Sequence, residues 1–83
     1  MSSTAVRVYG ETWCGDCQRV KALLTRHQVP FEWLDTSRDL EARDFVSRTL
    51  PGEERIPVVV LGDGSCLVEP SDDELSARLG LEG

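Results

Sequence analysis

The sequence has no apolar run that approaches membrane-spanning length. Residues 1–5 contain neither the basic region nor the apolar core of an export signal, so we expect a cytoplasmic protein that does not bind membranes. Basic residues are also scarce, with 9 against 15 acidic residues and a formal net charge of -6. This balance argues against nucleic acid as a partner, because phosphate binding needs a basic face.

Repeats, linkers and low-complexity segments are absent as well, and 83 residues predict one domain over residues 1–83, most simply a monomer. A chain this short has no room for a large enclosed pocket, so its chemistry is expected in a surface groove. Only three cysteines occur, and an odd number does not fit a disulfide framework. Cys66 stands alone and is expected to be a small, half-buried strand residue.

Hydrophobic periodicity predicts four strands and three helices. The expected strands are 5–9, 31–35, 57–61 and 66–68, and the expected helices are 14–27, 39–50 and one that begins at the capping box 71–74. The order strand, helix, strand, helix, hairpin, helix predicts an α/β fold in which a four-stranded mixed sheet is flanked by three helices. We expect Trp33 in the core, and Arg19 and Lys21 on the solvated face of the first helix.

The chemistry centres on a Cys-Gly-Asp-Cys motif that begins the first predicted helix. Unpaired backbone N–H groups and the helix dipole stabilise a thiolate at a helix N-terminus, and the thiolate is the reactive nucleophile. Cys14 is therefore the predicted nucleophile. Cys17, one turn further on, is close enough to attack a mixed disulfide formed on Cys14, so the pair predicts a thiol–disulfide oxidoreductase.

Two other functions compete with this interpretation of the motif. A zinc site needs four ligands, and the remaining candidates, Cys66 and His27, have no neighbour at ligand spacing, so no metal site is expected. An iron–sulfur carrier that holds a cluster on Cys14 between two subunits stays open, and the visible spectrum of the purified protein would separate it from an enzyme. A redox-fold adaptor without activity is a third alternative, which an unreactive Cys14 would favour.

The segment Tyr9-Gly-Glu-Thr-Trp-Cys-Gly-Asp-Cys17 resembles the active-site segment of the glutaredoxins, Tyr-Ser-Lys-Thr-Trp-Cys-Pro-Tyr-Cys. Arg55-Ile-Pro57 resembles their Thr-Val-Pro loop, whose proline is cis. Together with Asp63-Gly-Ser65 and Pro70-Ser-Asp-Asp-Glu74, the motif is most similar to the mycoredoxins of actinobacteria, which reduce mixed disulfides with mycothiol. The resemblance implies a thioredoxin/glutaredoxin fold over nearly the whole chain.

The resemblance also implies roles for individual residues. It makes Cys14 the nucleophile, Cys17 the resolving cysteine and Pro57 a cis-proline that leaves the backbone of Ile56 free to pair with a substrate. The residues expected to bind substrate are Trp13, Arg55, Ile56, Pro57, Ser71 and Asp72. The implied co-substrate is mycothiol or another small thiol, with no bound cofactor, and the implied partners are proteins that carry disulfides or thiol adducts.

The departures from the glutaredoxin pattern concern the small thiol. Glu11 stands where glutaredoxins have a lysine that holds a carboxylate of glutathione, and Val68-Glu-Pro-Ser71 replaces their Gly-Gly segment, so both changes argue against glutathione. The Asp16 carboxylate lies in the same positive potential at the helix N-terminus that would stabilise a Cys14 thiolate. Its negative charge is therefore expected to disfavour that thiolate. A redoxin reduced by thioredoxin reductase is the alternative within this class.

Overall fold

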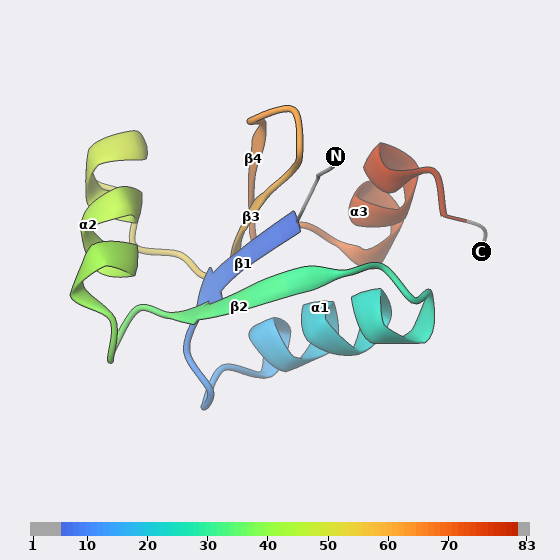
Figure 1. Ribbon diagram of the computed structural model, residues 1–83, viewed down its shortest axis with the longest axis horizontal. Helices are drawn as coiled ribbons and strands as arrows, with labels where there is room; N and C mark the ends of the chain where they lie inside the picture. The colour runs from blue at the N-terminus through green and yellow to red at the C-terminus, as the bar shows by residue number, and fades with distance from the viewer. Residues whose placement is uncertain (1–5, 82–83) are drawn as a thin grey trace.

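The computed structural model describes residues 6–81 and contains one four-stranded sheet and three helices (Figure 1). The elements along the chain are β1 (Val6–Gly10), α1 (Gly15–Arg26), β2 (Phe31–Asp35), α2 (Leu40–Thr49), β3 (Val58–Val60), β4 (Cys66–Val68) and α3 (Asp72–Leu79). The sheet has the strand order β2-β1-β3-β4; β1 pairs with β2 in parallel and with β3 antiparallel, and β3 pairs antiparallel with β4. The predicted fold class is therefore confirmed.

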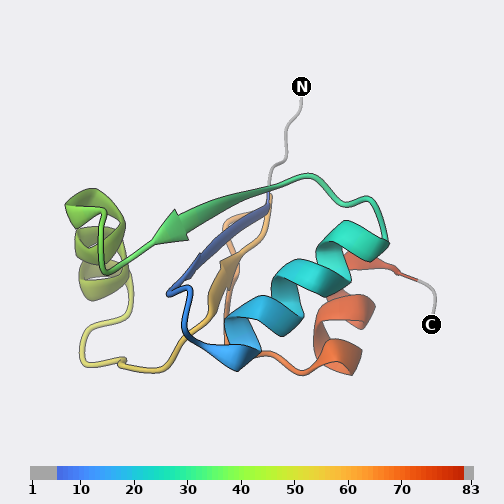
Figure 2. The same cartoon turned by 90° about the horizontal axis from the view of Figure 1, so that it is seen from below.

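Alternating side chains on the strands divide the core into two clusters. Helices α1 and α3 lie together against one face of the sheet, and α2 lies on the other side (Figure 2). The first cluster joins Val8 and Val59 to Leu24 of α1 and Leu75 of α3, all of them fully buried. The second cluster places Tyr9 and Ala42 together, and Phe45 of α2 stacks on the Tyr9 ring with 4.9 Å between the centroids.

The element boundaries differ from the predicted ones for local reasons. Ala5, predicted to begin the first strand, lies outside the described residues. Strand β3 is shorter than predicted because Pro57 has no N–H to donate, and because the Leu61 N–H bonds to Ser65 in the turn rather than to a strand. Asp39 lies just before α2, where its carboxylate accepts hydrogen bonds from the N–H groups of Glu41 and Ala42.

Two predictions about helix and strand side chains have different outcomes. Trp33 is partly buried and packs against the first core cluster, as predicted. Lys21 is partly exposed, as expected on the solvated face of α1, but its ammonium group also lies over the Trp33 ring, 4.1 Å from the centroid, a contact that was not predicted. The long apolar stem of lysine reaches from α1 to this ring, which the spacing along the helix does not reveal.

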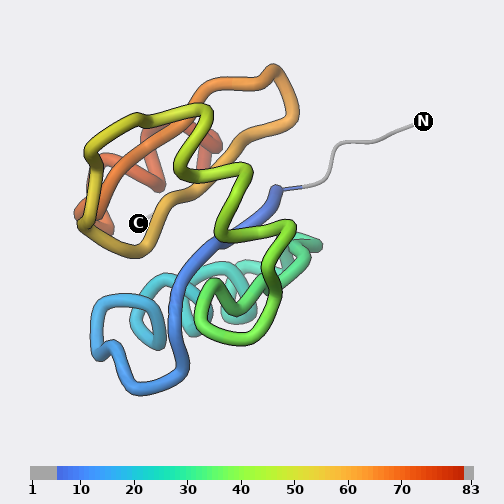
Figure 3. Tube along the Cα trace, turned by 90° about the vertical axis from the view of Figure 1, so that its left-hand side faces the viewer, coloured from blue at the N-terminus to red at the C-terminus, as the bar shows by residue number. Residues whose placement is uncertain are grey.

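The topology brings three separate segments to one end of the molecule. The loop between β1 and α1, the segment that leads into β3 and the segment between β4 and α3 meet there (Figures 2 and 3). The Thr36 N–H donates to the Gly10 carbonyl (2.9 Å), and the Glu69 N–H donates to the Pro57 carbonyl (2.7 Å). The cysteine motif and the predicted substrate-binding residues therefore lie at the same end of the fold.

Candidate active site

The two cysteines of the motif differ sharply in their access to solvent. Cys14 is half-buried and occupies the N-cap of α1 in an extended conformation, whereas Cys17 lies in the first turn and is fully buried. The Cys14 N–H donates to the Glu11 carbonyl (3.1 Å), and the Cys14 carbonyl accepts from the Gln18 N–H (3.1 Å). Both thiols are free, so the structure describes the reduced form, in which Cys14 is the sulfur that a substrate can reach.

The surroundings of Cys17 keep its thiol protonated. Burial, the largest effect, raises the pKa of Cys17 from 9.0 to about 12. A hydrogen bond from the Glu11 backbone lowers this pKa, but the neighbouring Cys14 thiol and the Asp16 charge raise it. At neutral pH the reduced protein therefore holds Cys17 as a thiol, and Cys14 is the more accessible sulfur of the two.

Gly10 makes room for the Cys17 sulfur. A Cβ atom added at Gly10 would lie 2.3 Å from Cys17 Sγ and 3.2 Å from Cη2 of Trp33. The first distance is far below van der Waals contact, so a larger residue would displace the buried thiol. The end of β1 thus approaches Cys17 closely, and the role of Gly10 went unnoticed in the sequence because it depends on this tertiary contact.

The loop that leads to Cys14 is held by side-chain hydrogen bonds. Trp13 is 75% exposed, and its indole Nε1–H donates to a carboxylate oxygen of Glu11. The Thr36 hydroxyl has two acceptors within reach of its single proton, the other carboxylate oxygen of Glu11 (3.5 Å) and the Gly10 carbonyl (3.4 Å). The Gln18 side-chain amide donates to the Thr12 carbonyl (2.9 Å). Thr36 and Gln18 were missed from the sequence because their hydroxyl and amide groups carry no motif of their own.

The segment before β3 brings Arg55, Ile56 and Pro57 to the site. The Ile56–Pro57 peptide bond is cis, as the resemblance implied, and Pro57 is buried. The Arg55 guanidinium donates to both carboxylate oxygens of Glu53, at 2.9 Å and 3.2 Å, and this pair lowers the pKa of Glu53 to about 2. A ligand carboxylate that binds Arg55 must compete with Glu53, a partner that the sequence did not reveal.

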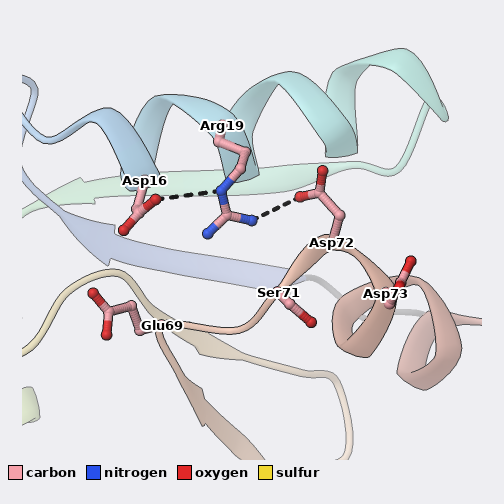
Figure 4. Close-up of a pocket in the computed structure, with 6 residues that line it drawn as sticks. All are labelled: Asp16, Arg19, Glu69, Ser71, Asp72 and Asp73. Atoms are coloured by element: carbon pink, nitrogen blue, oxygen red, sulfur yellow. Dashed lines mark hydrogen bonds and ion pairs between the residues drawn. The ribbon is translucent and has the colours of Figure 1, made fainter.

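An acidic groove of about 500 Å³ lies beside Asp16 (Figure 4). Its lining residues are Asp16, Arg19, Glu69, Ser71, Asp72 and Asp73. Four carboxylates and a single guanidinium group thus line this groove. The Ser71 hydroxyl accepts from the Glu74 N–H (3.0 Å) and so caps α3, as the capping box predicted.

Arg19 joins the two helices that border the acidic groove. Its guanidinium lies 2.7 Å from the Asp72 carboxylate and 3.4 Å from that of Asp16, and it donates to the Pro70 carbonyl (3.1 Å) (Figure 4). Arg19 is partly exposed, as expected on a solvated helix face, but its ion pairs with Asp16 and Asp72 were not predicted. The i,i+3 spacing of Asp16 and Arg19 could have indicated half of this network, but Asp72 lies 53 positions further along the chain.

A second groove, of about 200 Å³, opens on the other side of the cysteine loop. Its lining residues are Glu11, Thr36, Arg43, Val46, Ser47, Glu53, Glu54, Arg55 and Ile56. Six of the predicted site residues line one groove or the other: Asp16, Ser71 and Asp72 the acidic groove, and Glu11, Arg55 and Ile56 this one. The other four line neither groove: Trp13, Cys14, Cys17 and Pro57.

Within residues 6–81, no three side chains of His, Cys, Asp or Glu are arranged to hold a metal ion. Over the same described range, no helix combines the length and the apolar character needed to cross a bilayer.

Comparisons with known proteins agree with this geometry. The Glutaredoxin family model matches residues 6–66. A protein of Mycobacterium tuberculosis strain H37Rv that carries a glutaredoxin name is 35% identical over 79 residues, which cover 95% of this chain and 94% of that protein. A variant of a thioredoxin-like protein of known structure superposes with a TM-score of 0.83 and 27% identity, over 93% of this chain and 96% of the other. The glutaredoxin-like NrdH-redoxin from Escherichia coli shares the fold, with a TM-score of 0.77 and 23% identity over 95% and 99% of the two chains.

Proposed function

The chain belongs to the glutaredoxin family of thiol–disulfide oxidoreductases, and we propose that it reduces mixed disulfides through Cys14 and Cys17 with mycothiol as the small thiol. The observation that carries the proposal is the contrast between the accessible Cys14 at the N-cap of α1 and the buried, protonated Cys17. In this proposal Cys14 meets the substrate, and Cys17 reacts only with Cys14.

In the proposed reaction, the Cys14 thiolate attacks the mycothiol sulfur of a protein–mycothiol disulfide. A new disulfide joins Cys14 to mycothiol, and the protein sulfur leaves and takes up a proton. A second mycothiol can then attack this intermediate, which releases mycothiol disulfide and restores the Cys14 thiolate. Alternatively, Cys17 loses its proton and attacks Cys14, which releases mycothiol and leaves a Cys14–Cys17 disulfide to be reduced by two further thiols.

The charge around the site supports a small thiol without ionised groups. Glutathione carries two carboxylates, whereas mycothiol joins an acetylated cysteine to an amino sugar and inositol and carries none. Four carboxylates and one guanidinium group line the acidic groove, and three carboxylates, that of Glu11 among them, outnumber two guanidinium groups in the other, so an anionic thiol would meet a net negative charge on both sides. Mycothiol avoids this repulsion and suits a cytoplasmic, reducing environment, where we place the protein.

The remaining predicted site residues fit this reaction as binding groups. We propose that the exposed Trp13 ring and the backbone of Ile56 meet the substrate disulfide, with Pro57 fixing the course of that backbone. Ser71 and Asp72 form part of the groove wall, where one caps α3 and the other pairs with Arg19. Each of them contacts protein groups already, so we expect them to shape the site more than to bind ligand strongly.

Two variants test the division of roles between the cysteines. Cys14→Ser should abolish reduction of a mycothiol mixed disulfide, whereas Cys17→Ser should still turn it over, because a second mycothiol resolves the intermediate. The assay supplies mycothiol, glutathione or thioredoxin reductase in turn as the reducing system. If Cys17→Ser is as inactive as Cys14→Ser with every small thiol, and only the reductase supports the native chain, the protein is a dithiol redoxin and the mycothiol proposal fails.

A further inference from the structure

We propose that Glu11 is a positioning residue whose carboxylate holds the Trp13 indole beside Cys14, so that the ring forms one wall of the site for the substrate disulfide. This inference rests on the proposed role of Cys14 as the nucleophile. It assigns to Glu11 a function that differs from the repulsion of anionic thiols.

The first observation is that a large, exposed ring has a fixed hydrogen bond. Trp13 is 75% exposed, so most of its ring is free to contact a partner. Its indole N–H nevertheless donates to the Glu11 carboxylate instead of to water alone. The hydrogen bond restrains the ring about its side-chain torsions, and a restrained ring loses less entropy when a substrate packs on it.

The second observation is that Glu11 is itself held at two points. Its other carboxylate oxygen lies 3.5 Å from the Thr36 hydroxyl, which can donate to it, at the turn that follows β2. Its backbone carbonyl accepts from the Cys14 N–H (3.1 Å). The position of the ring is thereby tied to Cys14 and to the end of β2.

The ring fixed in this way suits the sulfur and apolar atoms of a disulfide. Sulfur makes favourable contacts with aromatic rings, most often near the ring edge. A wall of this kind stabilises the bound substrate in the ground state and in the transition state alike, so its loss should raise KM and leave kcat nearly unchanged. The proposed ligand is therefore a disulfide with apolar groups next to its sulfurs.

Three variants separate the hydrogen bond from the charge. Glu11→Gln keeps an oxygen acceptor and removes the charge, Glu11→Leu removes both, and Trp13→Phe keeps a ring but removes the N–H. With a mycothiol mixed disulfide as substrate, we expect Glu11→Leu and Trp13→Phe each to raise KM by about three- to tenfold with kcat within about twofold. The double variant should be no worse than either single one, and Glu11→Gln should lie near the native KM.

A second measurement does not depend on turnover. The exchange rate of the Trp13 indole N–H, followed by NMR and assigned with a Trp33→Phe chain, should rise in Glu11→Leu and stay near native in Glu11→Gln. If Glu11→Gln matches Glu11→Leu in KM and exchange, or if Glu11→Leu leaves both at their native values, Glu11 does not position the ring. If every chain lacks mycothiol activity while the exchange rates differ as expected, it is the proposed function that fails, and the contact between the ring and Glu11 stands.

Discussion

Single residues give the two cysteines of the motif different surroundings. Cys14 and Cys17 are separated by only two residues, yet the first is half-buried and the second is fully buried behind Gly10 with a raised pKa. The sequence predicted this division from the position of the pair at a helix start. It did not predict the contact that hides Cys17, because the end of β1 closes over the sulfur only in the folded chain.

A lysine at position 11 should shift the choice of thiol toward glutathione. Glu11→Lys replaces a repulsive charge with an attractive one for the glutathione carboxylates, but it also removes the acceptor for the Trp13 indole. The quantity to measure is therefore the ratio of the glutathione-supported rate to the mycothiol-supported rate. This ratio in Glu11→Lys is compared with the ratio in Glu11→Leu, which also lacks the acceptor for the Trp13 indole. We expect a ratio about three- to tenfold higher in Glu11→Lys, reduced by added salt. Equal ratios in the two variants would show that the charge at this position does not select the thiol.

The Asp16 charge should lower the reduction potential of the Cys14–Cys17 pair, although by less than its position between the two cysteines alone would predict. Its negative charge disfavours a second negative charge on the neighbouring cysteines, but Arg19 lies 3.4 Å away and offsets part of that charge. Asp16→Asn should therefore raise the potential by about 10–20 mV, measured by equilibration in dithiothreitol redox buffers. Asp44→Asn, an exposed change on α2, is the matched control and should leave the potential unchanged. A potential that stays constant or falls in Asp16→Asn would leave this residue no tuning role.

Among the secondary structure elements, α1 and α3 depend on one another through Arg19. Its guanidinium bonds to Asp16 on its own helix, and to Asp72 and the Pro70 carbonyl at the start of α3. Arg19 is about one-third exposed, so each ion pair alone is weakened by solvent. The shared geometry of the three contacts is what joins the helices at the groove.

Replacing this arginine should loosen α3. Arg19→Met keeps much of the stem but removes all three polar contacts, so we expect a loss of about 1 kcal/mol in the free energy of unfolding. Urea denaturation measures it, and 1 M NaCl should reduce the difference from the native chain. Arg48→Met, an exposed residue in the last turn of α2, should change stability by less than about 0.5 kcal/mol. Equal effects of the two variants would show that the network adds nothing to stability.

The elements themselves could be predicted because their signals are local. Alternation indicated β2 with its observed limits, and the capping Ser71 marked the start of α3. Arg19 and Thr36 could not be placed, because their partners lie on other elements: Asp72 is 53 positions from Arg19, and Glu11 is 25 positions from Thr36. A pattern along one helix or loop shows which side chains share a face, but not which other segment covers that face.

For the whole molecule, burial of the active-site thiol makes stability depend on alkaline pH. Because the pKa of Cys17 rises from 9.0 to about 12 on folding, the unfolded chain releases its proton above pH 9 while the folded chain keeps it. The stabilising contribution is complete below pH 9 and is lost as pH rises from 9 toward 12. The free energy of unfolding should fall by up to about 1.4 kcal/mol per pH unit in this window.

The Cys17→Ser chain isolates this contribution, because serine does not ionise there. Urea denaturation of both chains between pH 8 and pH 10, with a phosphine reductant present, should show the steeper loss in the native chain. The range ends at pH 10 because burial also raises the pKa of Tyr9, which adds its own dependence above that value. Parallel curves for the two chains would mean that Cys17 ionises equally well folded and unfolded.

The overall fold was more predictable than the assembly of the site. One parallel crossover followed by a hairpin leaves few possible sheets, and the observed β2-β1-β3-β4 order is among them. The site needs three segments, around Cys14, Pro57 and Ser71, to arrive at one end of that sheet. Resemblance to the family indicated these segments, but the division of the site into two separate grooves follows from tertiary packing alone.

The close approach of Cys17 and Trp33 at Gly10 should also make the fluorescence of Trp33 depend on the redox state of the cysteine pair. Both Cys17 Sγ and Trp33 Cη2 border the small space at Gly10, so the redox-active sulfur lies near an indole that is partly shielded from water. Disulfides quench indole fluorescence more strongly than thiols do, so the emission of Trp33 should dim when Cys14 and Cys17 join. The exposed Trp13 directly precedes Cys14 and should dim as well, so a Trp13→Phe chain isolates the Trp33 signal. In that chain we expect the Trp33 emission to follow the redox state of the cysteine pair without any attached dye.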